Sequence, residues 1–353
     1  MLSAGHSAQA LPARQLVFPH DLGAHPGFRT EWWYITGHAS SGGRSFGFQL
    51  TFFRSRVAAT QQLASRFAAK QIVFAHAAVT DLQAGRLLHD QRIARWSGQP
   101  PHANSADLAA ASEQDTDLVL GNWSLRRGTD SLYRAHLPTS DFTLDLQFRE
   151  TQPLLLQGDA GLSRKGPDPA QASYYYSLPQ LAVSGALTVQ GQRFALDAPS
   201  ERAGVAWLDH EWSDELLHPE AVGWDWIGIN LFDGSALTAF RLRRRDGSTL
   251  WAGGSFRARG GAAQPFAPEA VRFMPGRSWR SPHTGASYPM AWDITTPAGR
   301  FSLQALLDDQ ELDSRGSTGS VYWEGLSELH DAAGAVVGRG YLEMTGYVTA
   351  LRL

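Results

Sequence analysis

The 353-residue chain contains no cysteine, which excludes disulfide bonds and thiolate metal sites. No run of about 18 apolar residues occurs, so the sequence predicts no transmembrane segment. Charged residues make up only 18% of the chain, and the formal net charge is −3. The short run Arg243-Arg244-Arg245 lies next to an Asp-Gly turn, and we expect it to be a solvated strand end. This composition gives no reason to expect a nucleic-acid or anionic-membrane partner. Phosphate-cradling glycine motifs are also missing, and we predict no cofactor.

The absence of cysteine suits an envelope protein that folds without the help of redox enzymes. The segment Ser7-Ala8-Gln9-Ala10-Leu11-Pro12 is similar to the end of a signal peptide with an Ala-x-Ala cleavage site. We therefore expect residues 1–24 to be an N-terminal extension with a signal-peptide remnant. The corresponding expectation for the protein is a periplasmic or secreted location.

The dominant pattern of the chain is that of β-strands. Apolar and small or polar residues alternate from Phe46 to Phe52, the period of a half-buried strand. Similar segments recur between frequent glycine turns, at 72–80, 142–148, 181–189, 237–242, 291–295 and 341–348. Many short strands with regular turns predict an all-β sandwich or barrel. Two Ala-rich stretches interrupt the pattern. We expect residues 58–70 to form a short helix or an ordered excursion between strands, and residues 104–117 to form a loop with a helical turn.

A weak internal repeat predicts two similar domains. Residues 31–37 and residues 223–229 each combine tryptophans with a following glycine turn and an apolar strand. A first strand that carries Trp and leads into a meander is typical of small ligand-holding barrels. Pro219 breaks the pattern between the repeats, so the expected domains are residues 25–215 and 216–353.

Residues 207–212 concentrate the most chemistry in the chain, because Asp209, His210 and Glu211 are flanked by Trp207 and Trp212. A buried carboxylic acid has a raised pKa and can donate a proton at neutral pH, and a neighbouring histidine can activate water. These three residues are the predicted catalytic group. In a strand, Asp209 and Glu211 share one face and His210 shares the other with Trp212. We expect the His210 face to meet the ligand, with Asp209 reaching it only at a bulge. The alternative is a salt-bridged pair that ties strands together.

Aromatic and titratable residues elsewhere are candidates for binding a ligand beside this group. They are Glu31, Trp33, His76, Tyr174, Tyr176, Trp212 and Trp224. Each has a structural alternative. Glu31 could pair with Arg29 or Arg54 and close the barrel, and His76 could be a hydrogen-bonded core histidine. The tyrosines could simply pack, and Trp224 could fill the second barrel.

Two motif matches carry little weight here. Residues 43–47 fit G-x-S-x-G, but they lie in a glycine-rich hairpin rather than at a strand-to-helix turn. Residues 210–214 begin like H-E-x-x-H, but the second histidine is replaced by Asp214 and the segment is not helical. A metal held by Asp209, His210 and Glu31 has no further support in the sequence, and we predict no metal.

Several segments together resemble the AttH/CrtC lipocalin-like family, and the resemblance covers almost the whole chain in the same motif order. The segments are 26–34, 76–81, 161–166, 173–177 and 206–212. The family includes carotenoid hydratases and proteins labelled predicted secreted hydrolases. The resemblance implies two tandem lipocalin-like antiparallel β-barrel domains, an envelope location and an apolar ligand. It also implies a possible association with an ABC-type exporter.

The resemblance implies an activity less directly than it implies a fold. The hydratase branch uses a His, a Trp, a Tyr and an Asp, and here His210 and Trp212 fit the first two. Residues 237–241, where the other two are expected, contain neither Tyr nor Asp. We therefore expect a protein that binds an isoprenoid- or polyketide-type ligand and adds water to, or rearranges, a C=C bond. The alternatives are a non-catalytic carrier linked to an exporter, and an ester or lactone hydrolase with a nucleophile or metal near His210.

Overall fold

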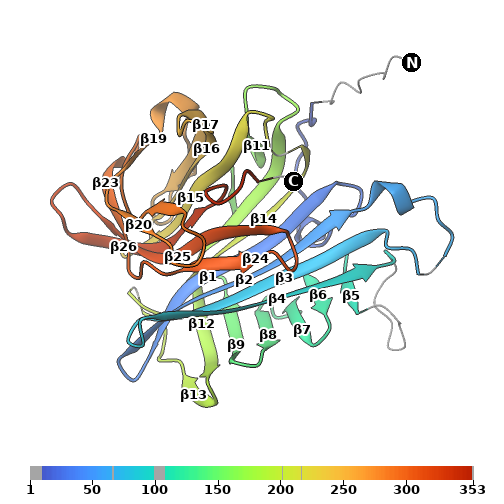
Figure 1. Ribbon diagram of the computed structural model, residues 1–353, viewed down its shortest axis with the longest axis horizontal. Helices are drawn as coiled ribbons and strands as arrows, with labels where there is room; N and C mark the ends of the chain where they lie inside the picture. Colours follow the sequence, from blue (N-terminus) through green and yellow to red (C-terminus); the bar gives the residue numbers. More distant parts are fainter. Residues whose placement is uncertain (1–9, 66, 99–107, 201, 216, 352–353) are drawn as a thin grey trace.

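The computed structural model of the chain (Figure 1) describes residues 10–65, 67–98, 108–200, 202–215 and 217–351. Residues 7–9 of the expected cleavage segment and residues 104–107 of the expected loop lie outside these ranges. Within them, the structure contains strands and three short 3-10 helices and no α-helix. The helices are η1 (His20–Leu22), η2 (Ala58–Thr60) and η3 (Pro268–Ala270).

The first fourteen strands form one antiparallel sheet. They are β1 (Thr30–Ser41), β2 (Arg44–Arg56), β3 (Gln71–Asp81), β4 (Arg86–Trp96), β5 (Ala109–Ala111), β6 (Asp117–Leu120), β7 (Trp123–Arg127), β8 (Tyr133–Pro138), β9 (Phe142–Arg149), β10 (Leu155–Leu156), β11 (Leu162–Arg164), β12 (Ala172–Val189), β13 (Gln192–Ala195) and β14 (Val205–Glu215). The strand order is β4-β3-β2-β1-β14-β12-β9-β8-β7-β6-β5. Because the two ends of this path, β4 and β5, lie against each other, the sheet is a nearly closed barrel.

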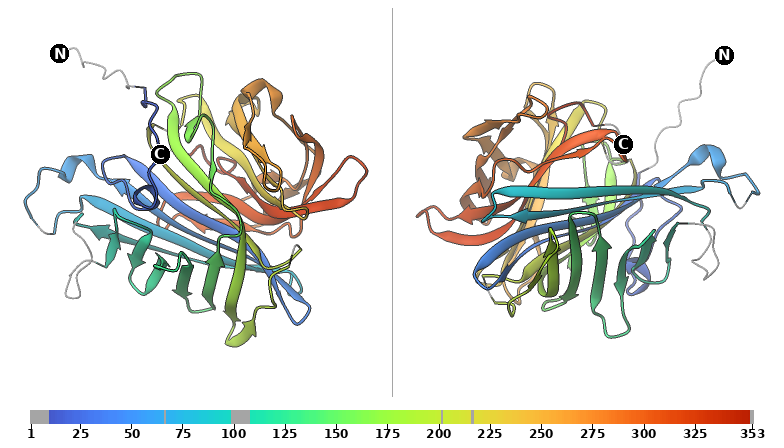
Figure 2. Two further views of the ribbon diagram at one scale, coloured as in Figure 1. Left: turned by 180° about the vertical axis from the view of Figure 1, so that it is seen from behind. Right: turned by 60° about the horizontal axis from the view of Figure 1, so that its bottom comes forward.

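The remaining strands follow β14 in the sequence. They are β15 (Ala221–Leu231), β16 (Ala236–Arg244), β17 (Thr249–Arg257), β18 (Gln264–Pro265), β19 (Arg272–Pro275), β20 (Ser278–Arg280), β21 (Ser287–Pro289), β22 (Ala291–Thr296), β23 (Gly299–Ala305), β24 (Glu311–Ser314), β25 (Ser320–His330) and β26 (Val336–Met344). Ten of them form a second antiparallel sheet, and β20 and β21 form a separate hairpin. Figure 2 shows the second sheet curved beside the first. The expectation of an all-β fold with two antiparallel barrel-type units is confirmed.

Each sheet encloses its own core because its strands alternate apolar residues toward the inside. In β2, Phe46, Phe48, Leu50 and Phe52 are all buried inside the first barrel, as their spacing predicts. The second sheet has a separate core around residues such as Trp292. Among the described residues of the Ala-rich segment at 58–70, the helical structure is the single turn η2. Within the described ranges, no helix has the length and apolar character needed to span a membrane.

A third apolar cluster joins the two sheets. It contains Tyr34 and Trp207 from the first sheet and Trp226, Phe240 and Tyr341 from the second. Hydrogen bonds cross the same contact, among them Ser255 Oγ to Gln157 Oε1 at 2.7 Å and Thr80 Oγ1 to Gln310 Oε1 at 2.8 Å. The interface therefore combines apolar packing with buried hydrogen bonds.

Candidate active site

Strand β14 divides the candidate residues between two environments. It pairs with β1 on one side, where Tyr34 lies opposite Asp209, and with β12 on the other. Its register with β1 runs without interruption from Val205 to Ser213, so its side chains alternate strictly. His210 and Trp212 point into the barrel, whereas Asp209 and Glu211 line a cavity outside it. β14 has no bulge at Asp209, so this residue reaches the cavity by ordinary alternation along the strand.

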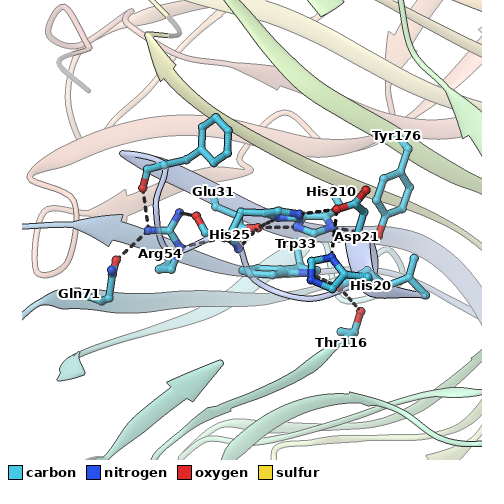
Figure 3. A network of polar contacts seen from close by, with 12 residues as sticks. His20, Asp21, His25, Glu31, Trp33, Arg54, Gln71, Thr116, Tyr176 and His210 are labelled. Atoms are coloured by element: carbon cyan, nitrogen blue, oxygen red, sulfur yellow. Dashed lines mark hydrogen bonds and ion pairs between the residues drawn. The ribbon is translucent and has the colours of Figure 1, made fainter. Parts of the chain in front are cut away.

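Inside the barrel, Glu31 is the centre of a buried polar network (Figure 3). Its Oε2 accepts a hydrogen bond from Arg54 Nε at 2.8 Å. Its Oε1 lies 2.7 Å from His25 Nδ1 and 2.9 Å from His210 Nε2. The far nitrogen of His25 lies 3.0 Å from the Asp21 carboxylate, and that of His210 lies 2.9 Å from the Tyr176 hydroxyl. The network therefore binds the segment before β1 to the barrel wall.

The surroundings shift the pKa values of the two histidines of this network in opposite directions. Burial lowers the pKa of His210 to about 4, although its hydrogen bond to Glu31 opposes the shift. Neutral His210 can donate from Nε2 to Glu31 and accept from the Tyr176 hydroxyl at Nδ1. Burial also lowers the pKa of His25, but hydrogen bonds to Asp21 and Glu31 outweigh it and raise the pKa above its ordinary value. His25 thus lies between two carboxylates that favour its protonated form.

His25 should make the stability of the protein depend on pH. Because its pKa is raised in the folded state, its contribution is complete below the ordinary value of 6.5 and is lost as the pH rises through the folded-state pKa. The free energy of unfolding, measured in urea at a series of pH values from 6 upward, should fall more steeply for the wild type than for His25→Gln. Parallel curves would show that folding does not change the pKa of His25.

His25, Glu31 and His210 also offer three metal-ligand atoms that lie within 4.8 Å of one another. These atoms already make hydrogen bonds, however. Both imidazoles contact the same Glu31 Oε1, and Arg54 Nε donates to the other carboxylate oxygen. Asp209 lies on the opposite face of β14 and does not join them. The arrangement is that of a hydrogen-bonded ion network, in which Glu31 pairs with Arg54 as in the structural alternative for this residue.

A cavity of about 500 Å³ lies between the two sheets, on the Asp209 face of β14. Its volume is within the range of small-molecule sites. Its lining is mostly apolar and includes the aromatic side chains of Trp32, Phe53, Phe74, Trp224, Trp226 and Phe240. Because these side chains come from both sheets, the cavity exists only when the two units are packed together.

Three hydrogen bonds hold the Asp209 carboxyl group in the wall of this cavity. Its Oδ2 accepts a hydrogen bond from the Tyr175 hydroxyl at 2.7 Å, and its Oδ1 accepts bonds from Trp207 Nε1 at 2.7 Å and from the Ser177 hydroxyl. Burial raises the pKa of Asp209 to about 7, against the lowering effect of these three donors. The carboxyl group can therefore hold or release a proton near neutral pH.

Glu211, two residues further along β14, is held in a different way. Its Oε1 lies 3.0 Å from Lys165 Nζ and accepts a hydrogen bond from the Ser173 hydroxyl. The Lys165 ammonium also lies 4.6 Å from the ring centroid of Tyr175 and 4.5 Å from that of Phe240. Lys165 thus compensates the charge of Glu211, whereas the donors to Asp209 are neutral. The two carboxyl groups therefore have different electrostatic surroundings.

The structure thus separates the residues that the sequence nominates. Asp209, Glu211, His76 and Trp224 line the cavity. His76 contacts the second sheet, with its ring nitrogens 2.8 Å from the Tyr322 hydroxyl and 2.8 Å from Ser317 Oγ, and burial lowers its pKa to about 3. The others lie in the first barrel or at its N-terminal segment: Glu31, Trp33, Tyr174, Tyr176, His210 and Trp212.

Sequence reasoning did not single out several groups of the two sites. His25 stacks on Trp212 with ring centroids 3.8 Å apart, but it stands in an irregular segment with no periodic signal. Tyr34, Glu324 and Glu343 line the cavity. The signal that the sequence offers is a glutamate within an apolar strand pattern, as at Glu324 and Glu343.

Comparisons with known proteins agree with this fold. The family model described as AttH-like matches residues 9–347. The crystal structure of a protein assigned as AttH in Nitrosomonas europaea has 45% sequence identity and a TM-score of 0.86, and the match covers 97% of this chain and 100% of that chain.

Two enzymes are more distantly similar. The structure of kievitone hydratase from Nectria haematococca has a TM-score of 0.71 at 16% identity, over 95% of this chain and 94% of that chain. A dehydratase, asqC of Emericella nidulans, is 25% identical over 170 residues, which is 44% of this chain and 43% of the dehydratase. The matched region thus spans less than half of that curated relative.

Proposed function

This chain belongs to the AttH-like family, and we propose that it adds water to, or removes water from, an apolar substrate in the cavity between its two sheets. The observation that carries the proposal is the state of Asp209. A carboxyl group with a pKa of about 7 lies in an aromatic cavity, and three donors fix its position. Perturbed carboxyl groups in clefts are typical of acid–base catalysis.

The geometry supports a simple reaction sequence for hydration. The Asp209 carboxyl transfers its proton to one carbon of a C=C bond, which leaves a carbocation on the other carbon. Aromatic faces such as those of Trp224, Trp226 and Phe240 can stabilise that cation. A water molecule then forms the C–O bond and loses a proton to the Asp209 carboxylate, so that the elements of H2O are added to the substrate and the acid is regenerated. Dehydration is the same sequence in reverse.

The relatives support the same class of chemistry without deciding the substrate. Kievitone hydratase and the asqC dehydratase are named for adding and removing water. The aromatic lining favours an unsaturated apolar molecule, and we propose an isoprenoid or polyketide type. Incubation of the protein with such alkenes in H2¹⁸O, followed by mass spectrometry, tests the proposal. A product that gains one labelled water is expected, and unchanged alkenes throughout a broad panel would contradict it.

The proposal predicts a pH dependence. Because the protonated form of Asp209 is the acid, kcat/KM for hydration should be maximal below about pH 7 and should fall above it. The hydrogen bond from Ser177 lowers the pKa of Asp209, so Ser177→Ala should move this falling limb upward by about one pH unit. Ser213→Ala is the matched control, because Ser213 bonds the Ala172 carbonyl instead. If Ser177→Ala does not move the falling limb of the pH profile, that limb reflects the titration of another group.

A carrier of apolar cargo, passed to or from an ABC-type exporter, is the second candidate. The apolar lining of the cavity favours it, since carriage needs no proton donor. Lipid extraction of the purified protein, followed by mass spectrometry, separates the two functions: an unmodified bound molecule supports carriage, and a hydrated product supports catalysis. The proposal includes a periplasmic or secreted location, which the lack of cysteine favours. Cell fractionation tests it.

A further inference from the structure

A second pair of carboxyl groups faces the cavity from the second sheet. Glu324 on β25 and Glu343 on β26 are direct cross-strand neighbours, and both line the cavity. Side chains in this relation have Cβ atoms about 5 Å apart on one face of the sheet. Two like charges so close together are unfavourable, so the pair retains protons. Burial and the charge of Glu343 raise the pKa of Glu324 well above its usual value, and burial raises the pKa of Glu343 to about 7.

Two polar atoms at this pair make no hydrogen bond of ordinary geometry within the ranges that the structure describes. They are Glu324 Oε1 and the Tyr34 hydroxyl, and the two side chains interact closely enough to affect each other's pKa. Both side chains are deeply buried, with relative exposures of 2% for Glu324 and 7% for Tyr34. Burial of a polar atom without a well-formed hydrogen bond is unfavourable, so such atoms in the wall of a cavity are typical of a site that a ligand or water completes.

The position of Tyr34 connects this group to the proposed reaction centre. Tyr34 lies directly opposite Asp209 in the β1–β14 register, and its side chain lines the same cavity. Burial, followed by the charge of Glu324, raises the pKa of Tyr34 well above its usual value, so the phenol stays protonated beside the carboxyl. The cavity therefore has Asp209 on one wall and a hydroxyl and two carboxyl groups next to it.

The available groups define what they can hold. A protonated carboxyl and a phenol each donate and accept hydrogen bonds, which matches a hydroxyl group of a ligand. A ligand carboxylate at this position would lie beside two acidic side chains, Glu324 and Glu343, and is therefore disfavoured. The Lys165 ammonium lies against Glu211 and the rings of Tyr175 and Phe240, rather than at this group.

We propose that Tyr34, Glu324 and Glu343 bind a hydroxyl group, phenolic or alcoholic, on an otherwise apolar substrate. This inference rests on the proposed function for its location and narrows the substrate to hydroxylated apolar molecules. The hydroxyl recognised here is a binding determinant and orients the reacting carbon toward Asp209.

The test uses three probes of one shape: 4-phenylphenol, biphenyl and 4-phenylbenzylamine. Their Kd values are measured by quenching of tryptophan fluorescence or by calorimetry. Wild-type protein should bind 4-phenylphenol at least about tenfold more tightly than biphenyl, because biphenyl leaves the buried polar atoms unpaired. Tyr34→Phe and Glu324→Met should each reduce this ratio. Unchanged affinity for biphenyl in both variants shows that the cavity is still formed.

Equal affinity for 4-phenylphenol and biphenyl in the wild type would overturn the inference. Tightest binding of the ammonium probe would also overturn it, because the acids would then act as a cation site. Asp209→Asn distinguishes the inference from the proposed function. It should remove hydration and leave the preference for 4-phenylphenol intact. Loss of hydration without any preference for the phenol leaves the function standing and refutes only the hydroxyl site.

Discussion

Replacement of Asp209 by Asn should reduce hydration activity by about two to four orders of magnitude, the usual contribution of a general acid. The amide has nearly the shape of the carboxyl group, so it can remain among Tyr175, Ser177 and Trp207, but it has no proton to give to carbon. The loss should appear in kcat rather than in KM, because proton transfer occurs only in the transition state. Steady-state kinetics on the substrate identified by ¹⁸O labelling measure it.

The matched control for this variant is Asp214→Asn on the same strand. The Asp214 carboxylate accepts a hydrogen bond from the Arg29 amide at the exposed end of β14 and lies outside the cavity. Its replacement should leave kcat unchanged. If Asp209→Asn turns over substrate as the wild type does, the proton comes from another group and the proposed mechanism is wrong.

Replacement of Glu31 by Gln should destabilise the protein by about 3–5 kcal/mol, because it leaves buried charges without their counter-ion. Glu31 is fully buried and contacts Arg54, His25 and His210 at once. A neutral amide cannot compensate both Arg54 and the protonated form of His25. The free energy of unfolding in urea, followed by tryptophan fluorescence, measures the effect.

The same variant separates a structural from a catalytic role for the barrel network. The folded fraction of Glu31→Gln should keep the hydration activity of the wild type, because the network and the cavity lie on opposite faces of β14. Asp117→Asn is the control for stability, since the Asp117–Arg126 ion pair is exposed and such pairs contribute little. A stable Glu31→Gln protein without activity would instead place Glu31 in the reaction.

The strand patterns were readable from the sequence because alternation is local. The spacing of Phe46, Phe48, Leu50 and Phe52 predicts the buried face of β2, and the structure confirms it. The same rule separates Asp209 and Glu211 from His210 and Trp212. Alternation cannot say which face meets a ligand, because both faces of β14 are buried. We expected the His210 side to meet the ligand, whereas the cavity in the structure lies on the Asp209 side.

The groups that sequence reasoning did not find are joined by contacts between distant segments. His25 reaches Glu31 and His210 because the segment before β1 folds against the barrel end, and nothing in its local composition indicates this contact. Glu324 and Glu343 meet Tyr34 only because the second sheet packs on the first. Pairings of this kind depend on how two sheets dock, which no periodicity within one strand encodes.

The sequence by itself determined the all-β class, the family and the concentration of acids and aromatics at 207–212, because these depend on residue type and short-range spacing. Only the tertiary structure decided the role of each acid. Glu31 became the counter-ion of Arg54, and Asp209 became a carboxyl with a pKa of about 7. The physical reason is that a carboxyl group titrates according to its burial and its partners. For both residues, those partners come from strands that the fold brings together.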